Sequence, residues 1–249
     1  MIYPEGEKKN KSKARLVIAL LIAVIIALSA TVIFLLKDKK DELTDEPRIE
    51  QPETDEEINM ITGMSESERK AINVFFSNFS EAHFGDYSKD SQDNYSLISF
   101  AFIHNLLNNY KKTVWQGEKM GISEETVNKT LDRFFGTQVP PETANLTQNH
   151  GWIYEDGSFW MPAASGESYD YYSIVKDMHE IGNGLFEAEY DVFYAGYDEL
   201  SDECYSYTID EAREKSEYIY SATAIVKPKT YNGKQTYELL KLTSNQEDF

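Results

Sequence analysis

Cysteine is almost missing from this sequence: Cys204 stands alone among 249 residues. An intrachain disulfide and a zinc site built on paired cysteines are therefore both excluded. The sequence also lacks three catalytic or binding motifs: the Gly-x-Ser-x-Gly motif of serine hydrolases, the phosphate-binding loop and the two-histidine motif of zinc proteases. Ser67 and Lys70 have the Ser-x-x-Lys spacing of penicillin-recognising enzymes, but the Lys-Thr-Gly and Ser-Asp-Asn partners of that chemistry do not occur. We therefore expect no catalytic residue, no cofactor and no metal ligand.

Basic residues are the second scarcity. The chain has 24 Lys and Arg against 43 Asp and Glu, a formal charge of −19. Residues 1–40 hold 8 of the basic and 3 of the acidic residues, which leaves 16 and 40 for the rest and a charge of −24 there. Such a field repels phosphate backbones, so nucleic acid is not an expected partner. It favours basic partners or divalent cations, or it serves only to keep the surface solvated.

Residues 16–36 lack charge, proline and glycine altogether, and only Ser29 and Thr31 among them are polar. At about 1.5 Å per residue, a helix of this length reaches about 31 Å, the thickness of a bilayer's hydrocarbon core. Five basic residues precede the run and three follow it closely. The positive-inside rule therefore places residues 1–15 in the cytoplasm and the remainder outside. The run continues past its small residues into a lysine cluster, which predicts an uncleaved anchor rather than a signal peptide.

Residues 37–64 contain acidic runs, two prolines and few large apolar groups. A segment of this composition cannot bury enough surface to offset its ordering entropy, so we predict an extended, disordered stalk. The remaining residues, 65–249, contain most of the Tyr, Phe and Trp side chains and are numerous enough for one folded domain.

The first part of this domain, residues 65–136, has helical periodicity. Ser65 and Glu68 form a capping-box pattern ahead of apolar residues that share one helical face. A second helix is predicted over residues 95–110, apolar nearly all round and therefore buried. A third runs from an N-cap at Ser123 to a stop at Gly136.

The second part, residues 150–243, has the two-residue period of strands. Asp156-Gly157 and Asn232-Gly233 are strong signals for tight hairpins, and Gly182-Asn183-Gly184 is a third turn. Strands are predicted over 152–154, 159–161, 172–181, 185–194, 218–226 and 236–242, with an acidic loop and a short helix between 195 and 215. Alternation along 185–194 predicts a sheet packed on one face and solvated on the other. The expected fold class is α+β, with three helices packed on a curved antiparallel sheet, as in the cones related to nuclear transport factor 2 or in cystatin-like folds.

Two clusters are candidates for docking a partner. Four acidic residues lie together in the loop 195–207: Asp198, Glu199, Asp202 and Glu203. They suit a solvated loop, a calcium ion held by carboxylate oxygens, or a patch for a basic partner. Three aromatic residues flank the first hairpin: Trp152, Tyr154 and Trp160. Alternation sends some of them outward, so they form either core or a groove for glycan or peptide.

Two stretches, INVFFSNFSE at 72–81 and DGSFWMPAASGE at 156–167, resemble sequences of envelope proteins from low-GC Gram-positive bacteria. With the order of helices, short hairpin and sheet, they make residues 66–243 similar to the secreted inhibitors of cell-wall D,L-endopeptidases. The resemblance implies a non-catalytic domain that binds something at the cell wall. This chain departs from those inhibitors, which are secreted free, in its predicted anchor and stalk.

The sequence thus predicts a single-pass membrane protein whose extracytoplasmic domain contacts a basic or cell-wall protein, a wall enzyme or a wall polymer, without catalysis. Two alternatives belong to other classes. One is a wall hydrolase acting through two carboxylates about 5–9 Å apart, and the other is a sensory or scaffold ectodomain.

Overall fold

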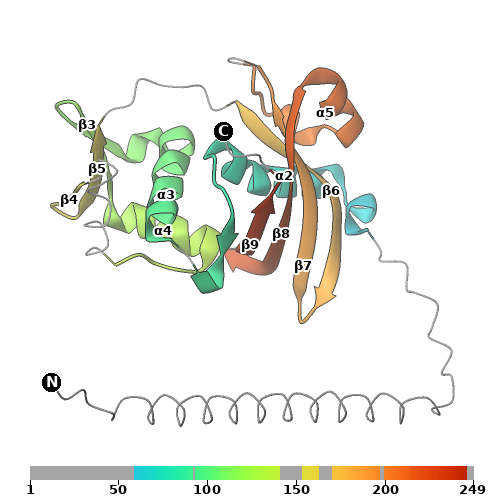
Figure 1. Ribbon diagram of the computed structural model, residues 1–249, viewed down its shortest axis with the longest axis horizontal. Coiled ribbons are helices and arrows are strands. Elements are labelled where there is room, and N and C mark those ends of the chain that lie inside the picture. The colour runs from blue at the N-terminus through green and yellow to red at the C-terminus, as the bar shows by residue number, and fades with distance from the viewer. Residues whose placement is uncertain (1–58, 92, 141–152, 163–169, 197–198, 246–249) are drawn as a thin grey trace, which may run out of the picture. The chain divides into compact units, whose positions relative to one another are not determined.

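The computed structural model describes residues 59–91, 93–140, 153–162, 170–196 and 199–245, drawn in colour in Figure 1. These ranges contain four α-helices and two antiparallel β-sheets, so the predicted α+β class is confirmed. No helix within them is long and apolar enough to cross a bilayer. The predicted span at residues 16–36 lies outside the described residues.

The predicted helices are present, and the second, predicted over 95–110, spans residues 94–108. The four α-helices are α2 (Glu66–Glu81), α3 (Asn94–Asn108), α4 (Glu124–Phe135) and α5 (Ile209–Lys215). The predicted capping box at Ser65 with Glu68 is present, and a second one, at Thr208 with Glu211, begins α5. Gly136 ends α4 in the left-handed conformation, at φ 59°. Short 3-10 turns are η1 (Met60–Gly63), η2 (Lys89–Ser91), η3 (Tyr110–Lys112) and η5 (Cys204–Ser206).

The larger sheet has the strand order β1-β9-β8-β7-β6. Its strands are β1 (Tyr87–Ser88), β6 (Tyr171–Gly182), β7 (Leu185–Tyr194), β8 (Glu217–Tyr231) and β9 (Lys234–Ser244). The turn between β8 and β9 has φ 49° at Asn232 and φ 74° at Gly233. Two positive φ angles are typical of the type I′ turn whose twist matches that of the flanking strands. The long hairpins predicted from these turns are therefore confirmed.

The first predicted hairpin does not join that sheet. It forms β4 (Ile153–Glu155) and β5 (Ser158–Pro162) in a separate sheet of order β2-β3-β5-β4. The other two strands, β2 (Thr113–Gln116) and β3 (Lys119–Ser123), occupy residues that the sequence does not predict as strands. Strand β2 has only four residues and is polar at both ends, so the alternation of apolar and polar residues that identifies a strand cannot be recognised in its sequence. The expectation of a single sheet is wrong for this reason.

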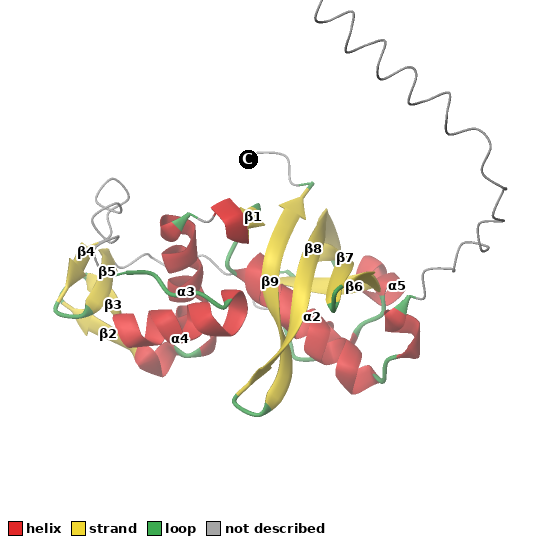
Figure 2. Cartoon of the chain, turned by 90° about the horizontal axis from the view of Figure 1, so that it is seen from below, coloured by secondary structure: helices red, strands yellow, loops and turns green. Residues whose placement is uncertain are grey.

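Two helices fill the space between the sheets. Figure 2 shows α3 and α4 between the small sheet and β9 of the large one. Phe79 on α2 and Phe100 on α3 stack at 5.2 Å between ring centroids, and Phe134 on α4 lies edge-on to both. Buried side chains from both sheets belong to the same apolar cluster. The described residues past 59 therefore share one main core.

Helix α2 lies across one face of the large sheet and also covers its edge strand, β6. Phe76 stacks on Tyr190 of β7 at 4.6 Å between centroids. At the edge, the Asn73 side-chain oxygen accepts the Val175 N–H at 2.9 Å, and Ser77 Oγ accepts the Ser173 N–H at 2.8 Å. The side chains of Asn73 and Ser77, one helical turn apart on α2, thus accept the hydrogen bonds that the backbone of a further strand would otherwise accept from β6. This arrangement satisfies backbone groups that an edge strand otherwise leaves open.

The opposite face of the large sheet is not solvated along its whole length, contrary to the prediction. A second apolar cluster covers one end of it, built from Tyr172, Phe193, Cys204 and Ala212 under η5 and α5. Asp191, expected to face water, is only 1% exposed. Its carboxylate accepts hydrogen bonds from Ser221 and Arg213 and lies 2.8 Å from Lys176 Nζ.

Residues 59–64, which the sequence assigns to the stalk, lie against the domain. The Asn59 side chain donates to the Lys176 carbonyl oxygen at 3.1 Å, and Ile61 and Met64 pack on the main core. Contacts of the folded part therefore begin at or before Asn59.

Candidate functional site: a cationic groove beside α2

A cavity of about 570 Å³ lies where α2, α4 and the tip of the β8–β9 hairpin meet. Helix α2 contributes an apolar floor of Ala71, Val74 and Phe75. The remaining lining is polar or charged: Ser67 and Lys70 from α2, Arg133 from α4, and Tyr231, Asn232, Lys234, Gln235 and Thr236 from the hairpin. No Asp or Glu is among these described lining residues. That composition is unexpected in a chain with 43 acidic residues.

The hairpin is held in place by contacts with α4 and α2. Lys229 Nζ donates to the carbonyl oxygen of Asp132 and lies 3.2 Å from its carboxylate. The Tyr231 hydroxyl donates to the Lys129 carbonyl oxygen at 3.3 Å. On the other side, the rings of Phe75 and Tyr237 are 5.7 Å apart. The turn that carries Lys234 is therefore fixed relative to both helices that line the groove.

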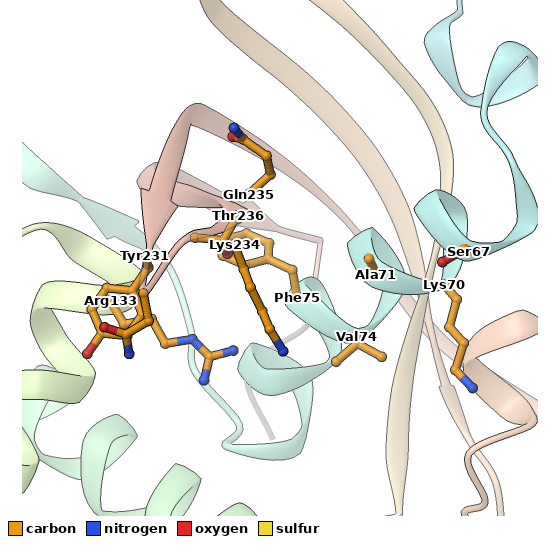
Figure 3. A pocket seen from close by; sticks show the side chains of 11 residues that line it. Ser67, Lys70, Ala71, Val74, Phe75, Arg133, Tyr231, Lys234, Gln235 and Thr236 are labelled. Atoms are coloured by element: carbon orange, nitrogen blue, oxygen red, sulfur yellow. The ribbon is translucent and has the colours of Figure 1, made fainter.

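Arg133 and Lys234 carry the charge of this cavity. Figure 3 shows the guanidinium and the ammonium pointing into the same space. Within the described residues, neither group makes a hydrogen bond or an ion pair, and the guanidinium carbon lies 4.6 Å from the centroid of the Phe134 ring. Burial lowers the pKa of Arg133, but a guanidinium remains charged in proteins. Neither cation has a counter-charge within the described residues, and an anion bound between them would provide one.

Two carboxylates beside this groove are paired with lysines. Asp132 precedes Arg133 on α4 and is paired with Lys229. Asp202 is paired with Lys70, whose ammonium points away from Arg133 and Lys234 in Figure 3. Neither acid therefore offsets the charge inside the cavity.

A second cavity, of about 350 Å³, continues the groove toward α3 and η3. It shares Arg133, Tyr231 and Asn232 with the first and adds Lys112 and Lys129. Glu125 is the one carboxylate among its described lining residues, and it is paired with Lys129. The rest of the lining is amides, hydroxyls and one imidazole: Asn105, Asn109, Thr126, Thr130 and His104.

The imidazole of His104 is neutral. It is 4% exposed and stacks on Phe100 at 5.9 Å between centroids. Burial, and secondly the positive charge of Arg133, lower the pKa of His104 to about 3. Nδ1 lies 3.4 Å from the Asn108 amide nitrogen. His104 therefore gives the second cavity a neutral wall and no additional charge.

On the opposite side the groove ends in an apolar slot of about 320 Å³. Met60, Met64 and Pro228 line it, and its one carboxylate among the described residues, Glu68, belongs to the capping box of α2. The cationic surface thus extends from Lys234 toward α3 and not toward η1.

The acidic residues proposed for docking do not converge. Asp198 lies outside the described residues. Glu199 folds back over Gly196, Asp202 pairs with Lys70, and Glu203 Oε1 lies 3.9 Å from Lys215 Nζ. In the part of the chain that the structure describes, no group of three or more His, Cys, Asp or Glu residues is placed to hold a metal ion.

The aromatic residues proposed for docking are also separated. Trp152 lies outside the described ranges, and the register of β4 and β5 places Tyr154 and Trp160 on opposite faces of the small sheet. Tyr154 faces the core, with its ring 5.1 Å from Phe159 and its hydroxyl donating to Glu124. Trp160 lies outward, with its ring over Gly121 and its Nε1 donating to the Glu155 carbonyl oxygen at 3.1 Å. They cannot form one platform.

One carboxylic acid in the described residues has a raised pKa. Burial raises the pKa of Glu81, which accepts hydrogen bonds from the Tyr205 hydroxyl at 2.8 Å and from Asn108 at 3.4 Å. Glu81 lines neither cavity of the groove. A hydrolytic pair needs a second carboxylate facing it across a cleft, and the partners of Glu81 are a phenol and an amide.

The groove was not predicted from the sequence, although the sequence contains two local patterns that are consistent with it. Lys129 and Arg133 are four residues apart, which places them on one face of a helix. Lys234 immediately follows the Asn232-Gly233 turn. Their convergence with Lys112 depends on the packing of the hairpin against α4, which no local pattern reports.

Comparisons with models of protein families, with curated proteins and with solved structures find no match for this chain. The resemblance to the endopeptidase inhibitors therefore remains a prediction, and the function has to be argued from the site.

Proposed function

We propose that this chain is a membrane-anchored binding protein of the cell envelope, and that its extracytoplasmic domain binds an anionic envelope component in the cationic groove without catalysis. The location comes from the apolar run at residues 16–36 and its basic N-terminal flank. In this proposal α2, crossing a bent antiparallel sheet, corresponds to the long helix of the cone-shaped folds. The resemblance to wall-associated inhibitors points to the same compartment.

The observation that carries the binding site is the unpaired charge of Arg133 and Lys234. Both cations face one cavity whose described lining lacks carboxylates, inside a domain that otherwise has a large excess of acid. A partly buried arginine is costly to leave without a counter-charge, and a planar guanidinium is well suited to phosphate or carboxylate. The ligand class is therefore anionic, whereas the overall charge alone favours a basic partner.

The binding test uses inorganic pyrophosphate as the probe and the full-length protein in a neutral detergent. Calorimetric titration at low salt should give saturable binding that weakens as salt is added. The double variant R133Q/K234Q should lose at least about tenfold in affinity, since each charge-assisted hydrogen bond contributes about 1.5–3 kcal/mol. Pyrophosphate that fails to bind, or that binds this variant equally well, would refute the site.

The matched control is K227Q/K241Q. Both lysines are exposed on the large sheet, outside the groove, and their loss changes the net charge by the same amount. This control should bind pyrophosphate within about twofold of the wild type, because screened charges outside the site contribute little. The location is tested separately, with a reporter fused after Phe249 that is active only outside the cytoplasm. A reporter active only in the cytosol would overturn the extracytoplasmic assignment.

A further inference from the structure

The two cavities of the groove adjoin each other. They meet at Arg133, Tyr231 and Asn232, which line both. Five of the 16 basic residues beyond position 40 lie along this path: Lys70, Lys112, Lys129, Arg133 and Lys234. Four of them remain when Lys70, which is paired with Asp202 and points away from Arg133 and Lys234 in Figure 3, is set aside. One of the four, Lys129, is itself paired with Glu125.

These four cations are spread along the groove rather than gathered at one point. Lys234 lies at the first cavity, Arg133 at the junction, and Lys129 and Lys112 at the second. Lys129 and Arg133 are one helical turn apart, which puts their Cβ atoms about 6 Å from each other. A single phosphate or carboxylate cannot contact all four. A ligand with anionic groups repeated every few ångströms can.

We propose that the groove binds a linear polyanion with repeating phosphate groups, one at Arg133 and Lys234 and the next at Lys129 and Lys112. This inference rests on the proposed function and specifies its ligand. The exposed amide of Asn109 lines the second cavity, where it can hydrogen-bond a polar group of such a chain, whereas Asn105 and Thr130 are buried and bonded to each other.

The surroundings limit how much of the polymer the protein contacts. The apolar slot beside Met60 and Met64 closes the path at one end. Beyond the groove the ligand faces a domain, residues 65–249, with 15 basic and 31 acidic residues and a net charge of −16, which repels further phosphates. Affinity should therefore rise with chain length only until both cavities are filled. A nucleic acid is the less suitable polyanion, because the second cavity's described lining has only two aromatic rings: His104 is buried, and the Tyr231 hydroxyl donates to the Lys129 carbonyl oxygen.

Glu125 provides a variant expected to gain binding. Its carboxylate is paired with Lys129 and competes with a ligand for that ammonium. The attraction of Lys129 and the hydrogen bond between them lower the pKa of Glu125, so the carboxylate is ionised at neutral pH. The variant E125Q should free Lys129 for the second phosphate. An increase in affinity cannot be mistaken for the effect of misfolding.

The test is a calorimetric titration of the full-length protein with pyrophosphate, tripolyphosphate and longer linear polyphosphates at one ionic strength. We expect affinity to rise about tenfold or more from pyrophosphate to the first chain that reaches both cavities, and then to level off. K112Q should reduce that gain, weakening the longer chain more than it weakens pyrophosphate, and E125Q should enlarge it. K234Q should weaken both ligands. The salt dependence of binding should also be steeper for the longer chain, because more counterions are released.

Several results would overturn the inference. They are equal affinities for pyrophosphate and long polyphosphate, a loss of both ligands in K112Q, a weaker polyphosphate complex in E125Q, or tighter binding of an oligothymidylate with the same number of phosphates. The proposed function is judged separately. If pyrophosphate binds at Arg133 and Lys234 and chain length adds nothing, the anion site stands and the polymer does not. If no phosphate ligand binds, both fall.

Discussion

Asn73 is expected to stabilise the edge of the large sheet. Its side chain is 4% exposed and bridges two segments of main chain. The oxygen accepts the Val175 N–H of edge strand β6 at 2.9 Å, and the amide donates to the Tyr205 carbonyl oxygen at 3.0 Å. In the variant N73A both main-chain groups lose their partner in a buried place. An unsatisfied buried group costs about 1–3 kcal/mol, so the free energy of unfolding should fall by about 2–4 kcal/mol.

Asn78 is the matched control, on the same helix and 6% exposed. Its amide donates to the Val74 carbonyl oxygen at 2.6 Å, within the backbone ladder of α2 itself. N78A removes no partner from another element and should cost less than about 1 kcal/mol. Urea unfolding of the full-length protein in detergent, followed by fluorescence, measures both variants. Hydrogen exchange should also be faster over residues 171–181 in N73A than in N78A. Equal stability losses, with unchanged exchange in β6, would refute the role assigned to the helix side chains.

Three further predictions concern the two cores and the small sheet. The variant D191A removes the carboxylate that lies between Lys176 and Arg213. It should lower the free energy of unfolding, measured by urea titration, by about 3–5 kcal/mol. A loss below about 1 kcal/mol would show that water takes the place of the carboxylate. The folded pKa of His104, about 3, lies below its ordinary value of 6.5, so its contribution to stability is complete above pH 6.5 and is lost as the pH falls toward 3. Between pH 6.5 and 3, the free energy of unfolding of H104F should therefore fall less steeply than that of the wild type, by up to about 1.4 kcal/mol per pH unit. An unchanged slope would contradict the low pKa of His104. In G121A the new methyl would lie 2.5 Å from the Trp160 ring. The expected cost is about 1–3 kcal/mol, and a double-mutant cycle with W160A should remove most of it.

Features that depend on neighbouring residues could be predicted from the sequence. The capping box at Ser65 and the stop at Gly136 each involve a few consecutive residues, and both occur as predicted. The same holds for the hairpin turns, since Asn232-Gly233 provides the two positive φ angles that a type I′ turn requires. In each case the chemistry that determines the structure lies within one or two turns of chain.

Features that depend on distant residues could not be predicted. Asp191 has the alternation of a solvent-facing residue, and only α5, some twenty residues later, covers it and provides Arg213. Strand β2 has too few residues for a period to show, and β3 pairs it with a hairpin that lies past α4. The groove is of the same kind. Its cations come from η3, α4 and β9, and each is an ordinary surface residue until the elements pack together.

The single thiol of the chain makes one part of this architecture measurable. Cys204 is enclosed by the second core, with its Sγ 3.7 Å from Ser201 Oγ. A thiol reagent can reach it only when η5 and α5 lift from the sheet, so the labelling rate reports that local opening. Because no other cysteine contributes to the signal, the movement of the layer that holds Asp202 beside Lys70 can be timed in the intact protein without introducing a probe.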